Sequence, residues 1–214
     1  KDIAFETRLR QEYPAGFIPG SEHISIRNKV QNFKGGNFIL TVPSGNYRCL
    51  PAPYERACVI ADYFKSKKLK AKVILLDENN TITIKKEGFQ SAFDELYADY
   101  IEYIPNTTIK KIDLDKKMVK TEFEDIEFEE AAFYPHVRGA KILERVGIAK
   151  DAKNMLEGNI DPLTYEVKGE QDIFIAGDSR PMGFSKSGNT SNSEGHHVAK
   201  LIAQKINKTK KIEW

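Results

Sequence analysis

The apolar positions of this chain form short continuous runs separated by amphipathic stretches, a pattern typical of a domain built on a parallel sheet. Residues 38–42 (FILTV) and 72–77 (KVILLD) each predict a buried strand. Between them, residues 54–64 place apolar side chains at helical spacing on one face. A strand, a helix and a strand in such close succession predict a βαβ unit and hence an α/β fold with a parallel sheet.

The rest of the pattern predicts further helices and strands. Helices are expected over residues 23–33, 89–97, 139–146 and 192–206, and strands over residues 101–103, 109–113, 118–121 and 126–134. The expected buried face of the last helix consists of Val198, Leu201, Ile202 and Ile206. Residues 173–178 (IFIAGD) predict one more buried strand, and a segment of small residues follows before the last helix.

The Gly-Asp pair at residues 177–178 places an acidic group at the carboxyl end of that predicted strand. In flavoproteins with two dinucleotide-binding domains, such an aspartate accepts a hydrogen bond from a ribityl hydroxyl of the flavin. The backbone amides of the following helix then offset the charge of the pyrophosphate. A helix cap in an ordinary α/β domain explains the same residues, and this motif alone does not separate the two interpretations.

The loop after the first predicted strand lacks the glycines of a nicotinamide site. A dinucleotide-binding βαβ unit carries Gly-x-Gly-x-x-Gly there, so that the backbone can approach a pyrophosphate. Residues 43–56 read PSGNYRCLPAPYER, with a single glycine followed by bulky residues. The sequence therefore predicts a nucleotide-site topology without pyridine nucleotide binding.

Cys49 stands in this loop where a phosphate cradle is missing. Open α/β sheets bind ligands at the carboxyl ends of their strands, and a helix N-terminus nearby favours the thiolate form of a cysteine. The alternative is a small buried apolar residue, which suits Cys58 better because Cys58 lies mid-helix on the apolar face. Loops carry function more often than packing, so Cys49 is the candidate reactive cysteine.

Composition removes several classes of function. The chain of 214 residues has 33 basic and 31 acidic side chains, a balance that does not indicate nucleic acid or a membrane surface as partner. No apolar run approaches the ~20 residues that a spanning helix needs. Two cysteines nine positions apart and four histidines do not form a metal-binding pattern. The chain begins with Lys1 rather than Met, so we expect a processed or partial sequence without a readable targeting segment.

Four motifs together resemble one family, the flavin subunit of flavocytochrome c sulfide dehydrogenase. Residues 47–56 (YRCLPAPYER) closely resemble its cysteine signature. Residues 134–142 (YPHVRGAKI), 161–165 (DPLTY) and 178–195 are similar to further segments of the family in the same order. The resemblance extends over nearly everything from about residue 35 onward, and the cysteine motif is its most specific part.

The resemblance implies a Rossmann-like parallel sheet domain inserted in a glutathione-reductase-type FAD domain. Residues 1–34 would be an N-terminal segment of the FAD domain, residues 35–130 the Rossmann-like domain, and residues 131–214 the C-terminal part of the FAD domain. This order also implies that residues 173–178 lie in a separate sheet from the first two predicted strands.

The resemblance further implies an enzyme that passes electrons from a small sulfur substrate, sulfide, through FAD to a cytochrome c subunit in the periplasm. Cys49 would be half of a redox-active disulfide beside the flavin, and Glu55 a carboxylate that moves protons. The residues implied to bind FAD are Gly177, Asp178, Lys186, Ser187, Gly188 and Asn192.

Two departures from the family pattern lead us to expect an incomplete site. The glycine fingerprint for the ADP half of FAD would precede Lys1, and the second cysteine of the disulfide would follow Trp214. We therefore expect that this chain alone does not retain FAD. Glu194 and His196 also replace the usual Gln and Lys near the last helix.

Two alternative functions stay open at this point. One is a related flavoprotein, of the sulfide:quinone or NAD(P)H-type oxidoreductases. The other is a non-catalytic domain that binds a partner protein and carries no cofactor. Flavin absorbance of the purified protein separates the enzymes from the binding domain.

Overall fold

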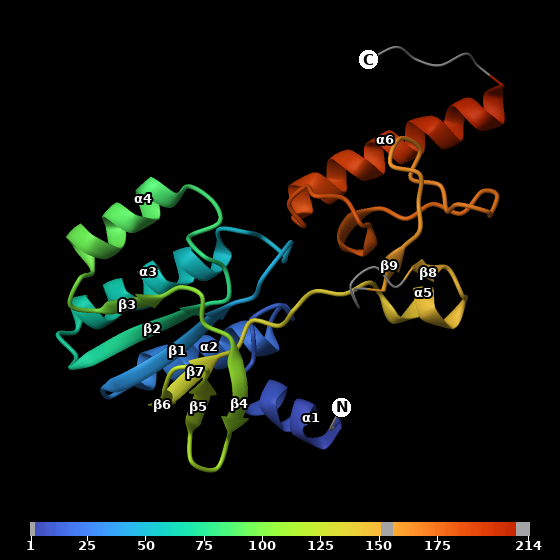
Figure 1. The fold of residues 1–214 in the computed structure, drawn as a ribbon. Helices are drawn as coiled ribbons and strands as arrows, with labels where there is room; N and C mark the ends of the chain where they lie inside the picture. Colours follow the sequence, from blue (N-terminus) through green and yellow to red (C-terminus); the bar gives the residue numbers. More distant parts are fainter. Residues whose placement is uncertain (1–2, 151–155, 209–214) are drawn as a thin grey trace. The chain divides into compact units, whose positions relative to one another are not determined.

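The computed structural model describes residues 3–150 and 156–208. The chain divides into two compact units, the first formed by Lys1–Gly45 and Pro51–Pro135 and the second by Asn46–Leu50 and His136–Trp214. Figure 1 shows the elements of each unit along the chain. The short segment 46–50 therefore leaves the first unit and joins the second.

The first unit is built on a four-stranded parallel sheet with the strand order β3-β2-β1-β7. The strands are β1 (Gly36–Val42), β2 (Ala71–Asp77), β3 (Ile101–Ile104) and β7 (Glu130–Ala132). Helix α3 (Ala52–Ser66) connects β1 to β2. This confirms the predicted βαβ unit and the α/β fold class.

One face of this sheet packs on α3 through aromatic side chains. Phe38 of β1 lies 6.3 Å from Phe64 of α3 between ring centroids. Phe33 stacks on Phe64 at 4.9 Å and meets Phe38 edge-on at 5.6 Å. Phe33 follows helix α2 (Ser21–Asn32), so these rings also attach α2 to the sheet.

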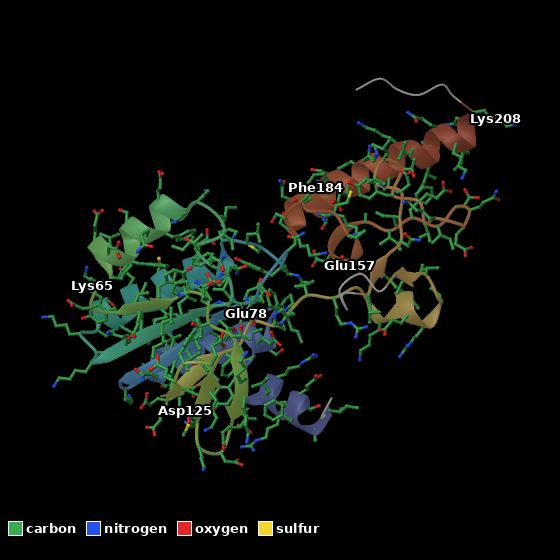
Figure 2. The ribbon with its side chains drawn as sticks, in the orientation of Figure 1. Lys65, Glu78, Asp125, Glu157, Phe184 and Lys208 are labelled. Atoms are coloured by element: carbon green, nitrogen blue, oxygen red, sulfur yellow. The ribbon has the colours of Figure 1, made fainter. Side chains whose placement is uncertain are left out.

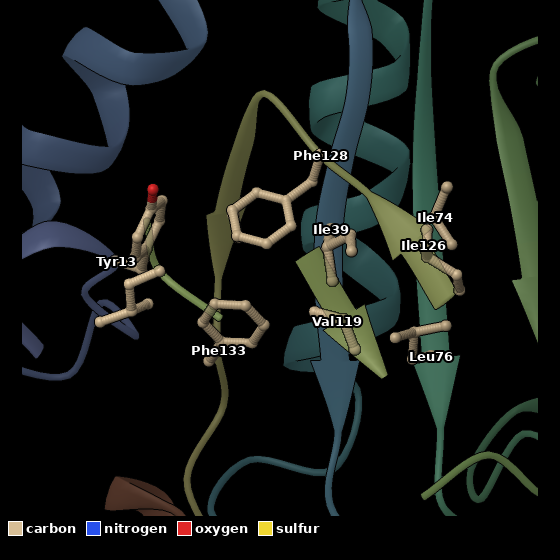
Figure 3. Close-up of a cluster of buried hydrophobic side chains, with 10 residues drawn as sticks. Tyr13, Ile39, Ile74, Leu76, Val119, Ile126, Phe128 and Phe133 are labelled. Atoms are coloured by element: carbon tan, nitrogen blue, oxygen red, sulfur yellow. The ribbon is translucent and has the colours of Figure 1, made fainter. Parts of the chain in front are cut away.

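The other face of the sheet is covered by a small antiparallel sheet (Figure 3). Its strands are β4 (Ile109–Asp113), β5 (Met118–Thr121) and β6 (Asp125–Glu127), which confirms the predicted hairpin and adds a third strand. Ile39 and Ile74 of the parallel sheet share a buried cluster with Val119 and Ile126. Helix α3 covers one face of β1 and β2, and this small sheet covers the other. Both strands are therefore buried on both faces, as their continuous apolar runs predict.

The single strand predicted over residues 126–134 is wrong, because this stretch serves two different sheets. It forms β6 in the antiparallel sheet and β7 in the parallel sheet. Phe128 N donates to Lys117 O on one side, whereas Glu129 N donates to Asn37 O on the other. The change of partner between these two residues ends one strand and begins the next.

Within residues 3–34, several side chains contribute to the core of the first unit. Helix α1 (Ile3–Glu12) is followed by Tyr13, whose ring contacts Phe128 and Phe133 edge-on, 5.4 and 5.9 Å away between centroids. The predicted helix over residues 89–97 is α4 (Lys86–Ser91) continued by a π-helical turn (Ala92–Leu96). The assignment of residues 1–34 to the FAD domain stays a prediction.

The described residues of the second unit, 46–50, 136–150 and 156–208, contain little regular structure. They form α5 (Lys141–Arg145), β8 (Ala149–Lys150), β9 (Glu157–Gly158), a 3-10 turn (Gly177–Ser179) and the long helix α6 (Gly188–Asn207). The buried apolar cluster of this unit is formed by Leu143, Ile160, Tyr165, Val167 and Ile175.

One prediction for the second unit is wrong, and another is right only in part. Residues 173–178 do not form a strand: among the described residues, Phe174 makes one isolated bridge to Glu166, and a 3-10 turn begins at Gly177. A strand needs a neighbour along its whole length, and here only one residue is paired. In α6, Val198, Leu201 and Ile202 of the predicted buried face are partly buried, and Val198 packs against the apolar cluster. Ile206 is 73% exposed instead, and Glu194 is buried.

Candidate functional site

Two distant segments of the second unit lie against each other. We call residues 46–50 the cysteine loop and residues 177–187 the Asp178 segment. The backbone N–H of Cys49 donates to Lys186 O at 2.8 Å, and Arg48 forms a parallel bridge with Lys186. These backbone contacts bring the candidate reactive cysteine to the segment that carries the candidate flavin-binding aspartate.

Side chains of the cysteine loop strengthen this contact. The Asn46 amide donates from Nδ2 to Met182 O and to Phe184 O, each at 2.9 Å. Tyr47 is buried, and its hydroxyl donates to Leu50 O at 2.8 Å, which closes the loop on itself. The loop is thus held at both its ends, and Cys49 lies between these contacts.

Cys49 itself has an unusual backbone conformation. Its φ of 53° lies in the left-handed region, which residues with a Cβ rarely adopt. Its side chain is partly buried and the thiol is free. The surrounding hydrogen bonds offset the cost of this conformation, and strained positions of this kind occur often at functional sites.

Glu55 and Cys58 belong to the first unit, unlike Cys49. Glu55 is exposed in the first turn of α3, where its backbone N–H donates to Pro51 O at 2.9 Å. Cys58 is partly buried on the same helix, and burial, with a smaller contribution from the charge of Glu55, raises the pKa of its thiol. The low thiolate fraction agrees with a packing role for Cys58. That Glu55 acts with Cys49 stays a prediction.

Asp178 lies in the 3-10 turn with its carboxylate paired to the cysteine loop. Arg48 Nε donates to Asp178 Oδ2 at 2.6 Å, and both side chains are partly exposed. Gly177 precedes it with a φ of 72°, and a Cβ there would come within 3.1 Å of Ser191 Oγ on α6. Glycine therefore allows the turn to approach the first turns of the helix closely.

Lys186 points into the protein rather than outward. Its side chain is 1% exposed, and its ammonium donates to Glu157 Oε1 at 2.6 Å, to Asp178 O at 2.6 Å and to Arg180 O at 3.1 Å. Three partners use the three hydrogens of the ammonium. Only the backbone of Lys186 is left to line a cofactor.

The remaining predicted cofactor residues surround the beginning of α6. Ser187 is the N-cap, and its hydroxyl accepts from Thr190 N at 3.2 Å. Gly188 and Asn192 are exposed on the first two turns, and a Cβ on Gly188 would meet nothing within 4 Å. The helix N-terminus is therefore open to solvent at Gly188.

A second charged pair lies beneath the Asp178 segment, and no pattern in the sequence predicts it. Arg180 and Glu194 form an ion pair with side chains 0% and 4% exposed. Gly177 N also donates to Glu194 Oε2, at 2.6 Å. In the sequence, Glu194 is only a departure from the family pattern, and a glutamate on a helix is most often exposed.

These residues fit a part of FAD. The partly exposed carboxylate of Asp178 suits a ribityl hydroxyl, provided that Arg48 yields its place, and the exposed start of α6 suits a phosphate. The buried ammonium of Lys186 does not fit this purpose. The described residues thus offer contacts to the ribityl and phosphate region, and the role of each stays a prediction.

In the first unit, protein groups occupy the carboxylate that would otherwise bind the ribose of a nucleotide. Asp77 ends β2, where nicotinamide-binding domains place the acid that binds the ribose. Its carboxylate is fully buried and accepts from Tyr54 and Tyr103 hydroxyls at 2.7 and 2.9 Å and from the amides of Asn79. Both oxygens are therefore occupied by protein groups, and the only sequence signal was an aspartate at the end of an apolar run.

Residues 3–150 and 156–208 contain no group of three or more His, Cys, Asp or Glu side chains placed to hold a metal ion. Within the same ranges, no helix combines the length and apolar character needed to cross a membrane.

A family model identifies the central part of the chain. The model for "Sulfide dehydrogenase [flavocytochrome c] flavoprotein chain, central" matches residues 24–133, just over half of the 214 residues. These residues comprise most of the first unit, including the parallel sheet, and the cysteine loop.

Solved structures share the fold at low sequence identity. A chain of the Tetrahymena thermophila mitochondrial ATP synthase F1Fo tetramer is similar with a TM-score of 0.68 and 14% identity, over 96% of this chain and 53% of that chain. The Cu(II) complex of the HOCl-induced flavoprotein disulfide reductase RclA from Escherichia coli is similar with a TM-score of 0.54 and 14% identity, over 81% of this chain and 40% of that chain. This chain thus spans about half, or less, of the length of these structures.

Proposed function

Because this chain belongs to the family of flavoprotein chains of flavocytochrome c sulfide dehydrogenase, we propose that it is part of an FAD-dependent oxidoreductase acting on a sulfur donor. The substrate in this proposal is sulfide, and the electron acceptor is a cytochrome c subunit. The family also supports a periplasmic location for the complete protein.

One observation within the chain supports this function most directly. The cysteine loop and the Asp178 segment lie against each other, with Cys49 N bonded to Lys186 O and Arg48 paired with Asp178. A flavin that bound to Asp178 would therefore meet a cysteine nearby. Sulfur chemistry at a flavin requires such an arrangement, in which a reactive sulfur and the cofactor share one site.

The residues of this chain have distinct roles in the proposal. Cys49 supplies one sulfur of a redox-active disulfide, with a partner cysteine elsewhere in the complete protein. Asp178 and the backbone from Ser187 to Gly188 hold the cofactor, while Glu55 moves the substrate proton. FAD, when bound, supplies an acceptor for two electrons.

Replacing each cysteine by serine in the complete protein tests the assignment. We expect Cys49→Ser to abolish sulfide oxidation while FAD stays bound, because a hydroxyl offers no exchangeable S–S bond. Cys58→Ser is the matched control, and we expect it to change stability rather than turnover. The measurements are sulfide-dependent reduction of cytochrome c and flavin absorbance after gel filtration. Loss of activity in Cys58→Ser with an intact fold would reverse the two roles.

A second candidate function is a binding domain without a cofactor. A chain of similar fold occurs in a mitochondrial ATP synthase assembly and matches 96% of this chain. In addition, the charged groups of Asp178 and Lys186 already have protein partners here. Flavin absorbance of the complete protein separates the two functions, because a colourless, correctly folded complete protein supports the binding domain.

A further inference from the structure

Two ion pairs lie inside the second unit beneath the Asp178 segment. Arg180 pairs with Glu194, and Lys186 pairs with Glu157, a residue of β9 marked in Figure 2. All four side chains are at most 10% exposed. Burying charges is costly unless each is paired and hydrogen-bonded, so these four residues strongly constrain the chain around them.

The two pairs form one network. Lys186 Nζ donates to Arg180 O at 3.1 Å and to Asp178 O at 2.6 Å, while Glu194 also accepts from Gly177 N. The backbone of the Asp178 segment therefore connects the two pairs at several points. We call Glu157, Arg180, Lys186 and Glu194 the buried charge network.

Arg180 extends this network to the carbonyls that the cysteine loop uses. Its Nη1 donates to Met182 O at 2.7 Å and to Phe184 O at 3.3 Å. These two carbonyls also accept from Asn46 Nδ2. One buried guanidinium thus orients the acceptors that hold one end of the cysteine loop.

Lys186 provides the second connection. Its side chain is fixed by Glu157, and its own carbonyl oxygen accepts from Cys49 N at 2.8 Å. That hydrogen bond holds Cys49 in its left-handed conformation, with φ of 53°. Lys186 therefore connects Glu157 to Cys49, through its side chain on one side and its backbone carbonyl on the other.

We propose that the buried charge network positions the Cys49 thiol, with Lys186 as the central positioning residue. The network fixes the Asp178 segment from inside, and this segment fixes the cysteine loop through Asn46 and Cys49. The importance of this for catalysis rests on the proposed function of Cys49, whereas the positioning itself is measurable as thiol reactivity without turnover.

The test measures the reaction of Cys49 with Ellman's disulfide reagent under native conditions. The background is Cys58→Ser, so that Cys49 is the one thiol that reacts. The double variant Lys186→Met/Glu157→Gln removes both charges and leaves neither unpaired. We expect Cys49 to react about tenfold faster, because losing the charged hydrogen bonds loosens the loop and exposes a partly buried sulfur.

Lys205→Met is the matched control, since Lys205 is an ion-paired lysine on α6 outside the network. We expect the Cys49 rate to be unchanged in this variant. The same charge-network variant in a Cys49→Ser background reports on Cys58 in the first unit. We expect the Cys58 rate to stay constant, because the effect is confined to the second unit.

Asn46→Ala is a second route that leaves the buried charges intact, and it should also accelerate the reaction of Cys49. The proposal is overturned if the Cys49 rate is unchanged in both folded variants, or if Cys49 and Cys58 accelerate equally. These outcomes are separate from the proposed function, which fails if Cys49→Ser retains sulfide oxidation in the complete protein.

Discussion

Asp161 illustrates how a single side chain shapes the irregular part of the second unit. Its Oδ1 accepts from Leu163 N at 2.8 Å and from Thr164 N at 3.1 Å. These two backbone amides hold the pKa of the Asp161 carboxyl below its usual range. The residue belongs to the DPLTY motif that resembles the family, and here the motif has a structural role in a turn.

The lowered pKa of Asp161 predicts a pH dependence of this turn. The folded state favours the ionised form, so its contribution is present above the pKa of the unfolded chain and is lost as pH falls through the folded pKa. We expect Asp161→Ala to reduce the hydrogen-exchange protection of the Leu163 and Thr164 amides at neutral pH. Protection factors corrected for the intrinsic pH dependence measure this directly.

Asp161→Asn is the control, because its carbonyl oxygen still accepts the two hydrogen bonds without titrating. This variant should keep most of the amide protection at neutral pH. Its protection should no longer fall as the pH is lowered. If both amides are protected equally in Asp161→Ala and in the original chain, the turn does not depend on this side chain.

At the scale of elements, helix α6 begins with a capped end that is exposed to solvent at Gly188. Ser187 has extended backbone angles and caps the helix through Thr190 N. The helix runs from Gly188 to Asn207, four residues earlier than its apolar pattern indicated. Small polar residues extended it because the cap satisfies amides that would otherwise be unpaired.

Removing this cap should destabilise the second unit. We expect Ser187→Ala to lower the free energy of unfolding by about 1 kcal/mol, the usual contribution of an N-cap. Urea unfolding followed by circular dichroism gives this difference. Ser187→Asp, which can also cap, should retain the stability of the original chain.

Ser193→Ala is a second control on the same helix, since the Ser193 hydroxyl donates to Asn189 O at an exposed position. We expect a change well below that of Ser187→Ala. Equal losses in the two alanine variants would mean that the Ser187 hydroxyl does not act as a cap in solution.

At the scale of the whole molecule, the chain offers contacts to only part of a dinucleotide. Asp178 is the candidate partner of a ribityl hydroxyl, but no Gly-x-Gly-x-x-Gly stands anywhere in the sequence. One charge-assisted hydrogen bond contributes about 1.5–3 kcal/mol. Micromolar affinity requires about 8 kcal/mol, so the chain falls well short.

We therefore expect this chain alone to lose FAD during gel filtration. The visible spectrum of the protein peak measures retained flavin after the chain is mixed with FAD. Arg48→Ala removes the partner of Asp178 and should not restore retention, because the sequence has no glycine fingerprint to hold the ADP half of FAD. Stoichiometric flavin in the protein peak would show that the chain holds a complete site.

A parallel titration with NADH should show no saturable binding. The loop after β1 lacks the required glycines, and the tyrosine-bonded Asp77 is unavailable to a ribose. NADH fluorescence measures this, and saturation in the micromolar range would contradict it.

The sequence by itself determined the elements whose signal is local. β1, α3 and β2 were predicted because continuous apolar runs and helical spacing describe burial that each element achieves with its nearest neighbours in the chain. The cysteine motif and the Gly-Asp pair were recognisable for a similar reason, since each is a short pattern. Candidate residues for the site could therefore be named at this level, and their roles stay a prediction.

Only the tertiary structure decided which residues that are far apart in the sequence contact each other. Residues 128–129 change sheets, and residues 173–178 form no strand because one bridge replaces a ladder. Lys186 and Glu194 read as surface or cofactor residues, yet their charges are buried against Glu157 and Arg180. A charge becomes stable inside a protein only when a partner from elsewhere in the chain meets it, and no local pattern encodes that meeting.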